Sequence, residues 1–241
     1  MRKFLLFVFI SVFCFANQGL EYYKNYKNKE YEKAAEVWEK ECAKDNFKSC
    51  SFLGYIYSQE KYVKQDYSKV IKLFKKACDA NEFGACFGLG WIYKNGKSIK
   101  QDDKKANNLY EKACNADIFE ACYNLGNSYY IGQGVKQDYS KSIKLYEKAC
   151  DGEVFNACYN AGVSYSEGKG VKQDYNKAIK LYEKACDGEY PMACNNLALA
   201  YFNGEGVKED YNKALKLSKK ACDLGEQMGC YNYDILNQIK Y

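Results

Sequence analysis

Hydrophobic and polar residues alternate along this chain with the period of an α-helix. In the segment 174–186 the apolar side chains recur at positions i, i+3, i+4 and i+7, as Ala178, Leu181, Tyr182 and Ala185. This spacing places them on one face of a helix. A second stretch has the same spacing and carries Ala193, Cys194, Leu197, Ala198 and Tyr201. The pattern predicts two amphipathic helices joined by the short link 187–190.

The residues that flank these stretches are typical of helix ends. An aspartate precedes the first helix wherever the pattern occurs, at Asp66, Asp102, Asp138, Asp174 and Asp210, and a carboxylate there can cap the helix N-terminus. Pro191 suits the first turn of the second helix. Paired glycines follow the second helix, at Gly132/Gly134, Gly168/Gly170 and Gly204/Gly206, where a left-handed backbone can end it. The predicted element is an αα-hairpin.

The hairpin recurs with a period of 36 residues. Its clearest marker is a cysteine pair of spacing 8, at Cys42 and Cys50, Cys78 and Cys86, Cys114 and Cys122, Cys150 and Cys158, Cys186 and Cys194, and Cys222 and Cys230. A fixed period of this length is typical of a solenoid, in which each unit packs only against its neighbours. We expect six units, at about 30–65, 66–101, 102–137, 138–173, 174–209 and 210–241, within one domain over 17–241. We call residues at the same position of successive units a column.

The N-terminus has the features of a secretory signal peptide. Met1, Arg2 and Lys3 form a short basic region, the apolar run 4–13 is too short to span a bilayer, and Cys14 and Ala16 offer small residues before a cleavage site. We expect cleavage after residue 16 and a secreted or periplasmic protein without membrane insertion. Acylation of Cys14 is a weaker alternative because large residues precede it.

The repeat geometry predicts how the cysteines are used. Residues eight apart on an unbroken helix would lie about 12 Å from each other, beyond the reach of a disulfide. A turn between the two helices brings each pair close, and an exported protein meets an oxidising environment. We therefore expect six disulfides, one within each pair of spacing 8. Free thiol pairs or metal sites are the alternative, although two thiols without further ligands make a poor zinc site, and we expect no metal.

Composition excludes several kinds of chemistry. The 241 residues include 13 cysteines, 25 tyrosines and no histidine, so triads with histidine and histidine-containing metal sites are ruled out. Removal of Arg2 and Lys3 with the signal peptide would lower the formal charge from +5 to +3, which is too weak to indicate a nucleic-acid partner. We expect no cofactor.

A glycine column and two lysine columns also repeat. We expect the glycines to allow close backbone packing, with Ala198 in place of glycine in the fifth unit, and the polar residues Asp234 and Asn237 to mark the last unit as a terminal cap. The lysines favour a solvated helix face over a basic ridge for anionic polymers. The columns are Gly54, Gly90, Gly126 and Gly162; Lys33, Lys69, Lys105, Lys141, Lys177 and Lys213; and Lys40, Lys76, Lys112, Lys148, Lys184 and Lys220.

The repeated motifs resemble a known family. Asp-Tyr-x-Lys-Ala-x-x-Leu-Tyr-x-Lys-Ala-Cys, followed by Ala-Cys-Tyr-Asn-Leu-Gly-x-x-Tyr and Gly-x-Gly-Val, is similar to the Sel-like repeats, which are related to tetratricopeptide repeats. The cysteine pair in each unit further resembles the Helicobacter cysteine-rich protein family, over residues 30–237. The resemblance implies a right-handed all-α superhelix of disulfide-linked hairpins. It also implies two functions, penicillin binding with weak β-lactamase activity and engagement of host cells by a secreted factor.

The residues give no catalytic constellation for a β-lactamase. Two Ser-x-x-Lys matches occur, Ser58 to Lys61 and Ser166 to Lys169, about as many as chance gives in a lysine-rich chain. The companion motifs of serine β-lactamases are missing from the sequence, and zinc enzymes need histidine. The catalytic residues therefore stay unknown, and a weak β-lactam-hydrolysing enzyme is the alternative function.

The best candidate for binding is a column of asparagines on the second helix. An amide offers two donors and an acceptor, so a row of amides could hydrogen-bond the main chain of an extended peptide, and neighbouring tyrosines would add contact area. A structural role, holding adjacent repeats together, is the alternative. We expect a monomeric scaffold whose concave groove binds peptides or proteins, with peptidoglycan fragments and β-lactams as further candidates. The proposed residues are Asn124, Asn160, Asn196 and Asn232, with Tyr123 and Tyr159 beside them and Tyr231 in the same column.

Overall fold

The computed structural model describes residues 31–59 and 64–239. These residues form twelve α-helices and no strands, which confirms the all-α prediction. The predicted signal peptide over residues 1–16 lies outside the described residues. The helices are α3 (Tyr31–Ala43), α4 (Phe47–Ser58), α5 (Tyr67–Asp79), α6 (Phe83–Asn95), α7 (Asp103–Asn115), α8 (Phe119–Ile131), α9 (Tyr139–Asp151), α10 (Phe155–Glu167), α11 (Tyr175–Asp187), α12 (Pro191–Asn203), α13 (Tyr211–Asp223) and α14 (Gln227–Ile239).

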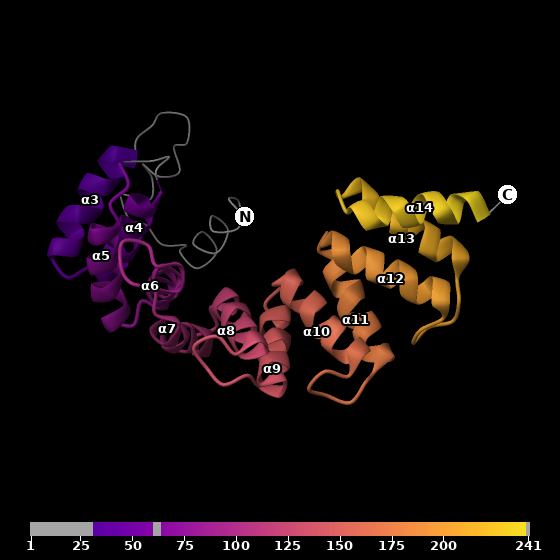
Figure 1. Cartoon of the computed structure of the whole chain (residues 1–241). Coiled ribbons are helices and arrows are strands. Elements are labelled where there is room, and N and C mark those ends of the chain that lie inside the picture. The colour runs from indigo at the N-terminus through magenta and orange to yellow at the C-terminus, as the bar shows by residue number, and fades with distance from the viewer. Residues whose placement is uncertain (1–30, 60–63, 240–241) are drawn as a thin grey trace. The chain divides into compact units, whose positions relative to one another are not determined.

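The chain divides into two compact units, Met1–Ile118 and Phe119–Tyr241, which we call unit 1 and unit 2. Within each unit every described helix packs against the next one in the chain. The helix labels in Figure 1 follow this order. Odd-numbered helices begin the hairpins and even-numbered helices complete them. In the part of each unit that the structure describes, the result is the solenoid arrangement of stacked helical pairs that the 36-residue period predicts.

The predicted helix ends are confirmed. The carboxylates of Asp66, Asp102, Asp138, Asp174 and Asp210 each accept a hydrogen bond from the backbone N–H three residues later, at 2.9 to 3.0 Å. Such a bond pairs one of the backbone donors that every helix N-terminus leaves open. At the other end, Gly96, Gly168 and Gly204 cap α6, α10 and α12 in the left-handed conformation, with φ between 62° and 70°.

The cysteines of all six predicted pairs form disulfides, which confirms that part of the sequence analysis. Five bridges have Cα–Cα distances of 4.4 to 4.8 Å, and they join Cys42 to Cys50, Cys78 to Cys86, Cys150 to Cys158, Cys186 to Cys194, and Cys222 to Cys230. Cys114 and Cys122, the remaining pair of spacing 8, are disulfide-bonded as well. The alternative of free thiol pairs is therefore wrong for these twelve residues.

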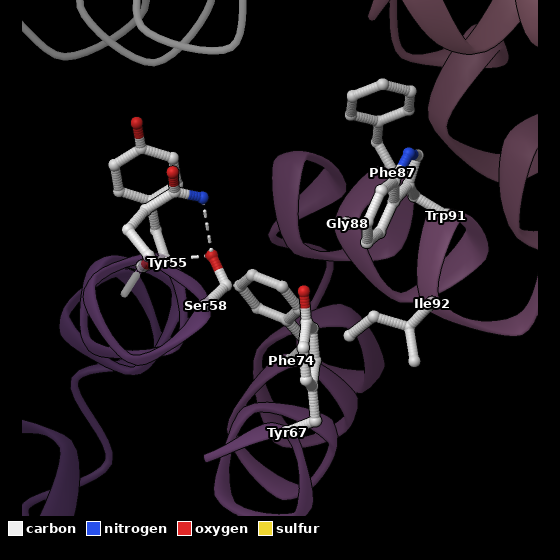
Figure 2. A pocket seen from close by; sticks show the side chains of 9 residues that line it. Tyr55, Ser58, Tyr67, Phe74, Phe87, Gly88, Trp91 and Ile92 are labelled. Atoms are coloured by element: carbon white, nitrogen blue, oxygen red, sulfur yellow. Dashed lines mark hydrogen bonds between the residues drawn. The ribbon is translucent and has the colours of Figure 1, made fainter. Parts of the chain in front are cut away.

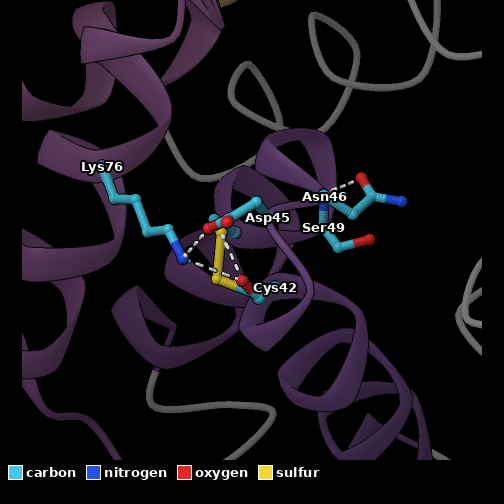
Figure 3. Close-up of a disulfide and its surroundings, with 6 residues drawn as sticks. Cys42, Asp45, Asn46, Ser49 and Lys76 are labelled. Carbon is cyan, nitrogen blue, oxygen red and sulfur yellow. Dashed lines mark hydrogen bonds and ion pairs between the residues drawn. A yellow bond between two sulfur atoms is a disulfide. The ribbon is translucent and has the colours of Figure 1, made fainter.

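The measured bridges lie across the turn inside a hairpin, as predicted. Each of the five joins the last turns of one helix to the first turn of the next helix. In the turn spanned by Cys42 and Cys50, Asn46 caps α4 by accepting a hydrogen bond from the Ser49 N–H at 3.1 Å (Figure 3). The turn shortens the separation that an unbroken helix would impose, so residues eight apart come within bonding distance.

The glycine column confirms close packing, and the structure shows what approaches it. A Cβ atom added to Gly54, Gly126 or Gly162 would lie 2.6 to 2.8 Å from an aromatic ring of the following helix, nearer than real Cβ contacts allow. The rings belong to Phe74, Tyr146 and Tyr182. In the next pair of this pattern, Ala198 replaces the glycine and Ser218 of the following helix replaces the ring.

The last helix exposes both polar and apolar side chains. Asp234 and Asn237 are exposed on α14, as expected for a terminal cap. Met228, Tyr231 and Ile239 are each more than half exposed on the same helix. Among the residues that the structure describes, no helix combines the length and the apolar character that crossing a membrane requires.

Candidate functional site

The predicted binding residues all belong to unit 2. Asn124, Asn160, Asn196 and Asn232 lie on α8, α10, α12 and α14, and each is half-buried. Tyr123 and Tyr159 are half-buried next to them, whereas Tyr231 is 59% exposed. The column therefore occupies the same position on four successive second helices, as the 36-residue period requires.

Tyr123 and Tyr159 pack against the first helix of the following repeat. Their rings lie 6.0 Å, centroid to centroid, from the rings of Tyr146 and Tyr182, respectively. Tyr159 also lies 5.2 Å from the ring of Tyr190. These distances are within the range of favourable aromatic contacts, so each predicted tyrosine forms part of the packing between two repeats.

The asparagine amides lie beside tyrosine hydroxyls and other side chains. Asn160 is close enough to the Tyr146 hydroxyl to lower its pKa, and Asn196 has the same effect on the hydroxyls of Tyr159 and Tyr182. The Tyr146 hydroxyl itself donates to the Asn127 Oδ1 atom at 2.6 Å. At the last repeat the Asn232 Nδ2 atom donates to the Asn195 Oδ1 atom at 2.8 Å.

Burial sets the ionisation of the tyrosines at this surface. It raises the pKa of Tyr146 to about 12, although hydrogen bonds from Ser142 and Asn160 lower it in part. Burial likewise raises the pKa of Tyr159 and of Tyr182 above the ordinary value. These hydroxyls are therefore neutral at physiological pH and act as hydrogen-bond donors and acceptors.

A pocket opens beside Asn196 in unit 2. It has a volume of about 220 Å³ and lies between the end of α10, the face of α11 and α12. Its polar lining comes from Ser166, Tyr182, Asn196, Asn203 and Glu205, and its apolar lining includes Ile179, Leu199 and Ala200. The walls combine hydroxyl, amide and carboxylate groups with aliphatic surface, which is the usual composition of a ligand pocket.

In the Ser-x-x-Lys match that the structure describes in full, Ser166 and Lys169 do not form a nucleophile and base pair. The Ser166 Oγ atom bonds the Val163 carbonyl at 2.9 Å and lies 3.2 Å from the Tyr182 hydroxyl. The Lys169 Nζ atom instead donates to the Tyr130 hydroxyl at 2.7 Å. In the other match, Lys61 lies outside the described residues. Within residues 31–59 and 64–239 no group of three or more Cys, Asp or Glu residues could hold a metal ion.

The two lysine columns have a role that the sequence analysis missed. In the first column, Lys69, Lys177 and Lys213 donate to tyrosine hydroxyls of the preceding repeat, those of Tyr57, Tyr165 and Tyr201, at 2.5 to 2.8 Å. In the second column, Lys76, Lys112 and Lys220 donate to the carbonyls of Cys42, Cys78 and Cys186 at 2.7 to 3.0 Å. The prediction that these lysines are only solvated is wrong, because they link neighbouring repeats.

The contact of Lys76 illustrates why this position suits a cation. Figure 3 shows its Nζ atom beside the Cys42–Cys50 disulfide, where it bonds the Cys42 carbonyl and pairs with the Asp45 carboxylate at 2.8 Å. Cys42 is in the last turn of α3, where backbone carbonyls lack helical partners and the helix dipole favours positive charge. The lysine therefore adds a charged donor to a carbonyl of the preceding repeat that otherwise accepts only from the turn, where the Asp45 N–H lies at 3.1 Å.

Stacked helical pairs with a disulfide in each turn define the class of this protein as a disulfide-linked α-solenoid of short repeats. The Sel1 repeat model matches residues 48–82, 84–118, 119–153, 156–190 and 191–226, which is more than half of the chain. The chain therefore belongs to the Sel1 repeat family. This fold supports a role as a protein-interaction scaffold, and the disulfides indicate an oxidising extracellular or periplasmic compartment.

Solved structures from several bacteria are similar to this chain. A Sel1 repeat protein from Oxalobacter formigenes is 28% identical, with a TM-score of 0.77, over 92% of this chain and 98% of that one. The protective antigen c5321 of uropathogenic Escherichia coli is 29% identical, with a TM-score of 0.78, over 81% of this chain. The present chain covers 42% of the length of that antigen.

A cysteine-rich relative is also similar. Helicobacter pylori cysteine rich protein B is 30% identical, with a TM-score of 0.44, over 55% of this chain and 96% of that one. No curated protein matches the chain significantly.

Proposed function

We propose that the protein is an exported scaffold that binds extended peptide segments of other proteins at the asparagine and tyrosine surface of unit 2. The observation that carries this proposal is the pocket of about 220 Å³ beside Asn196, whose lining joins two amides, three hydroxyls and the Glu205 carboxylate to aliphatic side chains. A peptide segment presents the matching groups, with main-chain donors and acceptors between side chains.

The amides retain capacity for a ligand after their internal contacts are made. An asparagine side chain has two N–H donors and an oxygen with two lone pairs. Asn196 lies close enough to the hydroxyls of Tyr159 and Tyr182 to lower their pKa, and these contacts use at most part of that capacity. Partial burial between these neighbours restricts the amide, and such preorganisation reduces the entropy that binding would cost.

The asparagine column also has a structural role, and a test must separate the two. We propose to measure binding of the oxidised protein to an array of random dodecapeptides, and then the affinity of the peptides retained, for the wild type and for Asn160→Ala/Asn196→Ala. We expect at least tenfold weaker binding, with a stability loss of about 1 kcal/mol for each hydrogen-bonded amide removed.

Exposed asparagines on the first helices provide a matched control. Asn176→Ala/Asn212→Ala changes two exposed side chains on α11 and α13 and should leave both peptide affinity and urea denaturation unchanged. If Asn160→Ala/Asn196→Ala lowers stability but leaves peptide affinity at the wild-type value, the column is structural and the proposed binding surface is incorrect.

Export by cleavage after residue 16 is a separate part of the proposal. It is supported by the basic and apolar pattern of residues 1–16 and by the disulfides, which require an oxidising compartment. Mass spectrometry of the protein expressed with its own N-terminus in a bacterial host should find a chain that starts near Asn17 outside the cytoplasm. An intact N-terminus in the cytoplasmic fraction would contradict it.

A further inference from the structure

A second pocket lies in unit 1, between α4, α5 and α6 (Figure 2). Its volume is about 60 Å³. The side chains of Phe74, Phe87, Trp91 and Ile92 supply aromatic and aliphatic walls, and Gly88 also lines the pocket. The polar members of the lining are Ser58, Gln59 and the hydroxyl of Tyr67. None of these residues belongs to the asparagine and tyrosine surface of unit 2.

This pocket occupies the same position within its repeat as the pocket beside Asn196 occupies in a later repeat. Moving three repeats along the chain converts Ser58, Tyr67, Phe74 and Gly88 into Ser166, Tyr175, Tyr182 and Asn196, all of which line the pocket of unit 2. The column therefore places glycine where the four later repeats carry asparagine. A Cβ atom at Gly88 would lie 2.6 Å from the Phe74 ring, so any side chain at residue 88 would take space at the opening of this pocket.

The size of the pocket selects among apolar groups. Cavities of about 150 Å³ hold a benzene ring, so about 60 Å³ is too small for an aromatic side chain. A pocket of this volume also holds no more than a few carbons of a straight acyl chain. The group that fits is the branched end of a valine, leucine or isoleucine side chain.

The polar rim favours a polypeptide as the carrier of that group. The Gln59 Nε2 atom donates to the Ser58 Oγ atom at 3.0 Å, which leaves the amide oxygen of Gln59 as an acceptor at the pocket edge. The Tyr67 hydroxyl accepts from Gln65 at 3.4 Å, so its own proton is available for donation. A donor and an acceptor beside an apolar pocket match the N–H and C=O groups that flank each side chain of a peptide.

We infer that this pocket binds a branched aliphatic side chain of a polypeptide ligand, with Gln59 and Tyr67 hydrogen-bonding the ligand main chain. The inference rests on the proposed function in that the ligand is a peptide, but it concerns residues of unit 1 alone. It adds sequence selectivity, because an apolar anchor of limited size distinguishes leucine from alanine and from phenylalanine.

The test uses blocked amino acids as probes. The oxidised full-length protein, labelled for NMR, is titrated with the N-acetyl methylamides of leucine, valine, alanine and phenylalanine, and the signals of the Ile92 methyl group and the Trp91 indole are followed. Each buried methylene changes affinity about fourfold. Leucine should therefore bind at least tenfold more tightly than alanine, and phenylalanine should not saturate the pocket signals.

Two matched variants test the position itself. Phe74→Tyr/Gly88→Asn copies the pair found at Tyr182 and Asn196, so it should fold, and it should abolish the response to leucine. Gly84→Asn adds the same side chain one turn earlier on α6, where the repeat two units further along the chain carries Asn156, and should leave the response unchanged. If the double variant does not fold, Trp91→Leu, which copies Leu199, should enlarge the pocket and admit phenylalanine.

The outcomes separate this inference from the proposed function. Equal affinity for leucine and alanine, or a leucine response that persists in Phe74→Tyr/Gly88→Asn, would overturn the inference while leaving peptide binding by unit 2 intact. Pocket signals that shift with protein concentration before any probe is added would show that a second copy of the chain fills the pocket, which also overturns it. Loss of unit 2 binding alone would leave the leucine response in place.

Discussion

The pockets of unit 1 and unit 2 occupy the same register of the repeat and differ in chemistry. In unit 1 the first helix contributes Phe74 and the second helix Gly88, and the space left is small and apolar. In unit 2 the equivalent residues are Tyr182 and Asn196, and the space is larger, with hydroxyl and amide groups in its walls. The backbone arrangement is common to both, so the side chains alone make the difference.

The residues at these two positions are paired in four of the repeats. Tyrosine in the first helix occurs with asparagine in the second at Tyr110/Asn124, Tyr146/Asn160 and Tyr182/Asn196, whereas phenylalanine occurs with glycine at Phe74/Gly88. The last repeat departs from this pairing with Ser218/Asn232. A tyrosine hydroxyl in a buried position needs a hydrogen-bond partner, and polar side chains of the second helices supply one, Asn127 for Tyr146 and Ser166 for Tyr182. A phenylalanine ring has no such need, so the amide can be absent and its space can serve another group.

The disulfides hold together the helices that form both pockets. Their removal should cause the largest loss of stability in either unit. Replacing Cys78 and Cys86 by serine frees α5 from α6, and replacing Cys186 and Cys194 frees α11 from α12. Each double variant should lose about 2–3 kcal/mol of unfolding free energy, because a bridge across a short loop restricts the unfolded chain. Urea denaturation measures this, and equal stability of wild type and variants would contradict it.

Substitution of the glycines that pack against Phe74 and Tyr182 should have the second largest effect on stability. Gly54→Ala pushes against Phe74 in unit 1, and Gly162→Ala pushes against Tyr182 in unit 2, with the new Cβ 2.6 to 2.7 Å from a ring atom. Overpacking of this kind should cost about 1–3 kcal/mol at each site. Ala198→Gly is the control. The next ring in its column is replaced by Ser218, so only the helix-propensity cost of about 1 kcal/mol is expected.

Converting the pocket of unit 2 into the type found in unit 1 tests the pairing of hydroxyl and amide. Tyr182→Phe and Asn196→Gly should each cost about 1 kcal/mol or more, because each leaves a polar partner without its bond. The double variant should cost less than the sum of the two by about 0.5–1 kcal/mol. Additive costs in a double-mutant cycle would show that Tyr182 and Asn196 are not coupled.

The smallest expected effect concerns the lysine contacts of the two units. Glu39 pairs with Lys69 in unit 1, and Glu147 and Glu183 pair with Lys177 and Lys213 in unit 2, whereas the second repeat carries Lys75 in that column, before Lys105. Lys75→Glu should add the missing pair and stabilise the protein by at most about 0.5 kcal/mol, with less effect at high salt. Lys72→Glu, on the exposed side of the same helix, should have no comparable salt-dependent effect in thermal unfolding.

Much of the fold could be predicted because its causes are local. Helix periodicity, the aspartate N-caps and the glycine C-caps are properties of neighbouring residues, and they recur in each repeat. The disulfide pairing followed from the turn between two helices, which brings cysteines eight apart within bonding distance, as at Cys150 and Cys158 or Cys222 and Cys230. The glycine column was predicted as a packing feature, but the ring that approaches each glycine belongs to the next repeat and could not be named from spacing.

The candidate site was predictable only in part. The asparagine column was found from its period, yet its partners, Tyr146, Tyr159 and Tyr182, depend on how second helices face the following first helix. Comparing columns would have given a signal, because Asn and Tyr occur together and Gly88 occurs with Phe74. The lysine contacts were missed for the same reason, since Lys76 bonds a carbonyl that lies 34 residues earlier in the chain.

The sequence by itself determined the class of this protein, a disulfide-linked helical repeat without histidine chemistry, because local periodicity and residue type are sufficient for that conclusion. Only the tertiary structure decided which side chains meet between repeats and where space remains. Those contacts join residues that are 12 to 39 positions apart, and the volume between them depends on the packing of several helices at once. For that reason two repeats with nearly the same backbone present an apolar pocket at Gly88 and a polar one at Asn196.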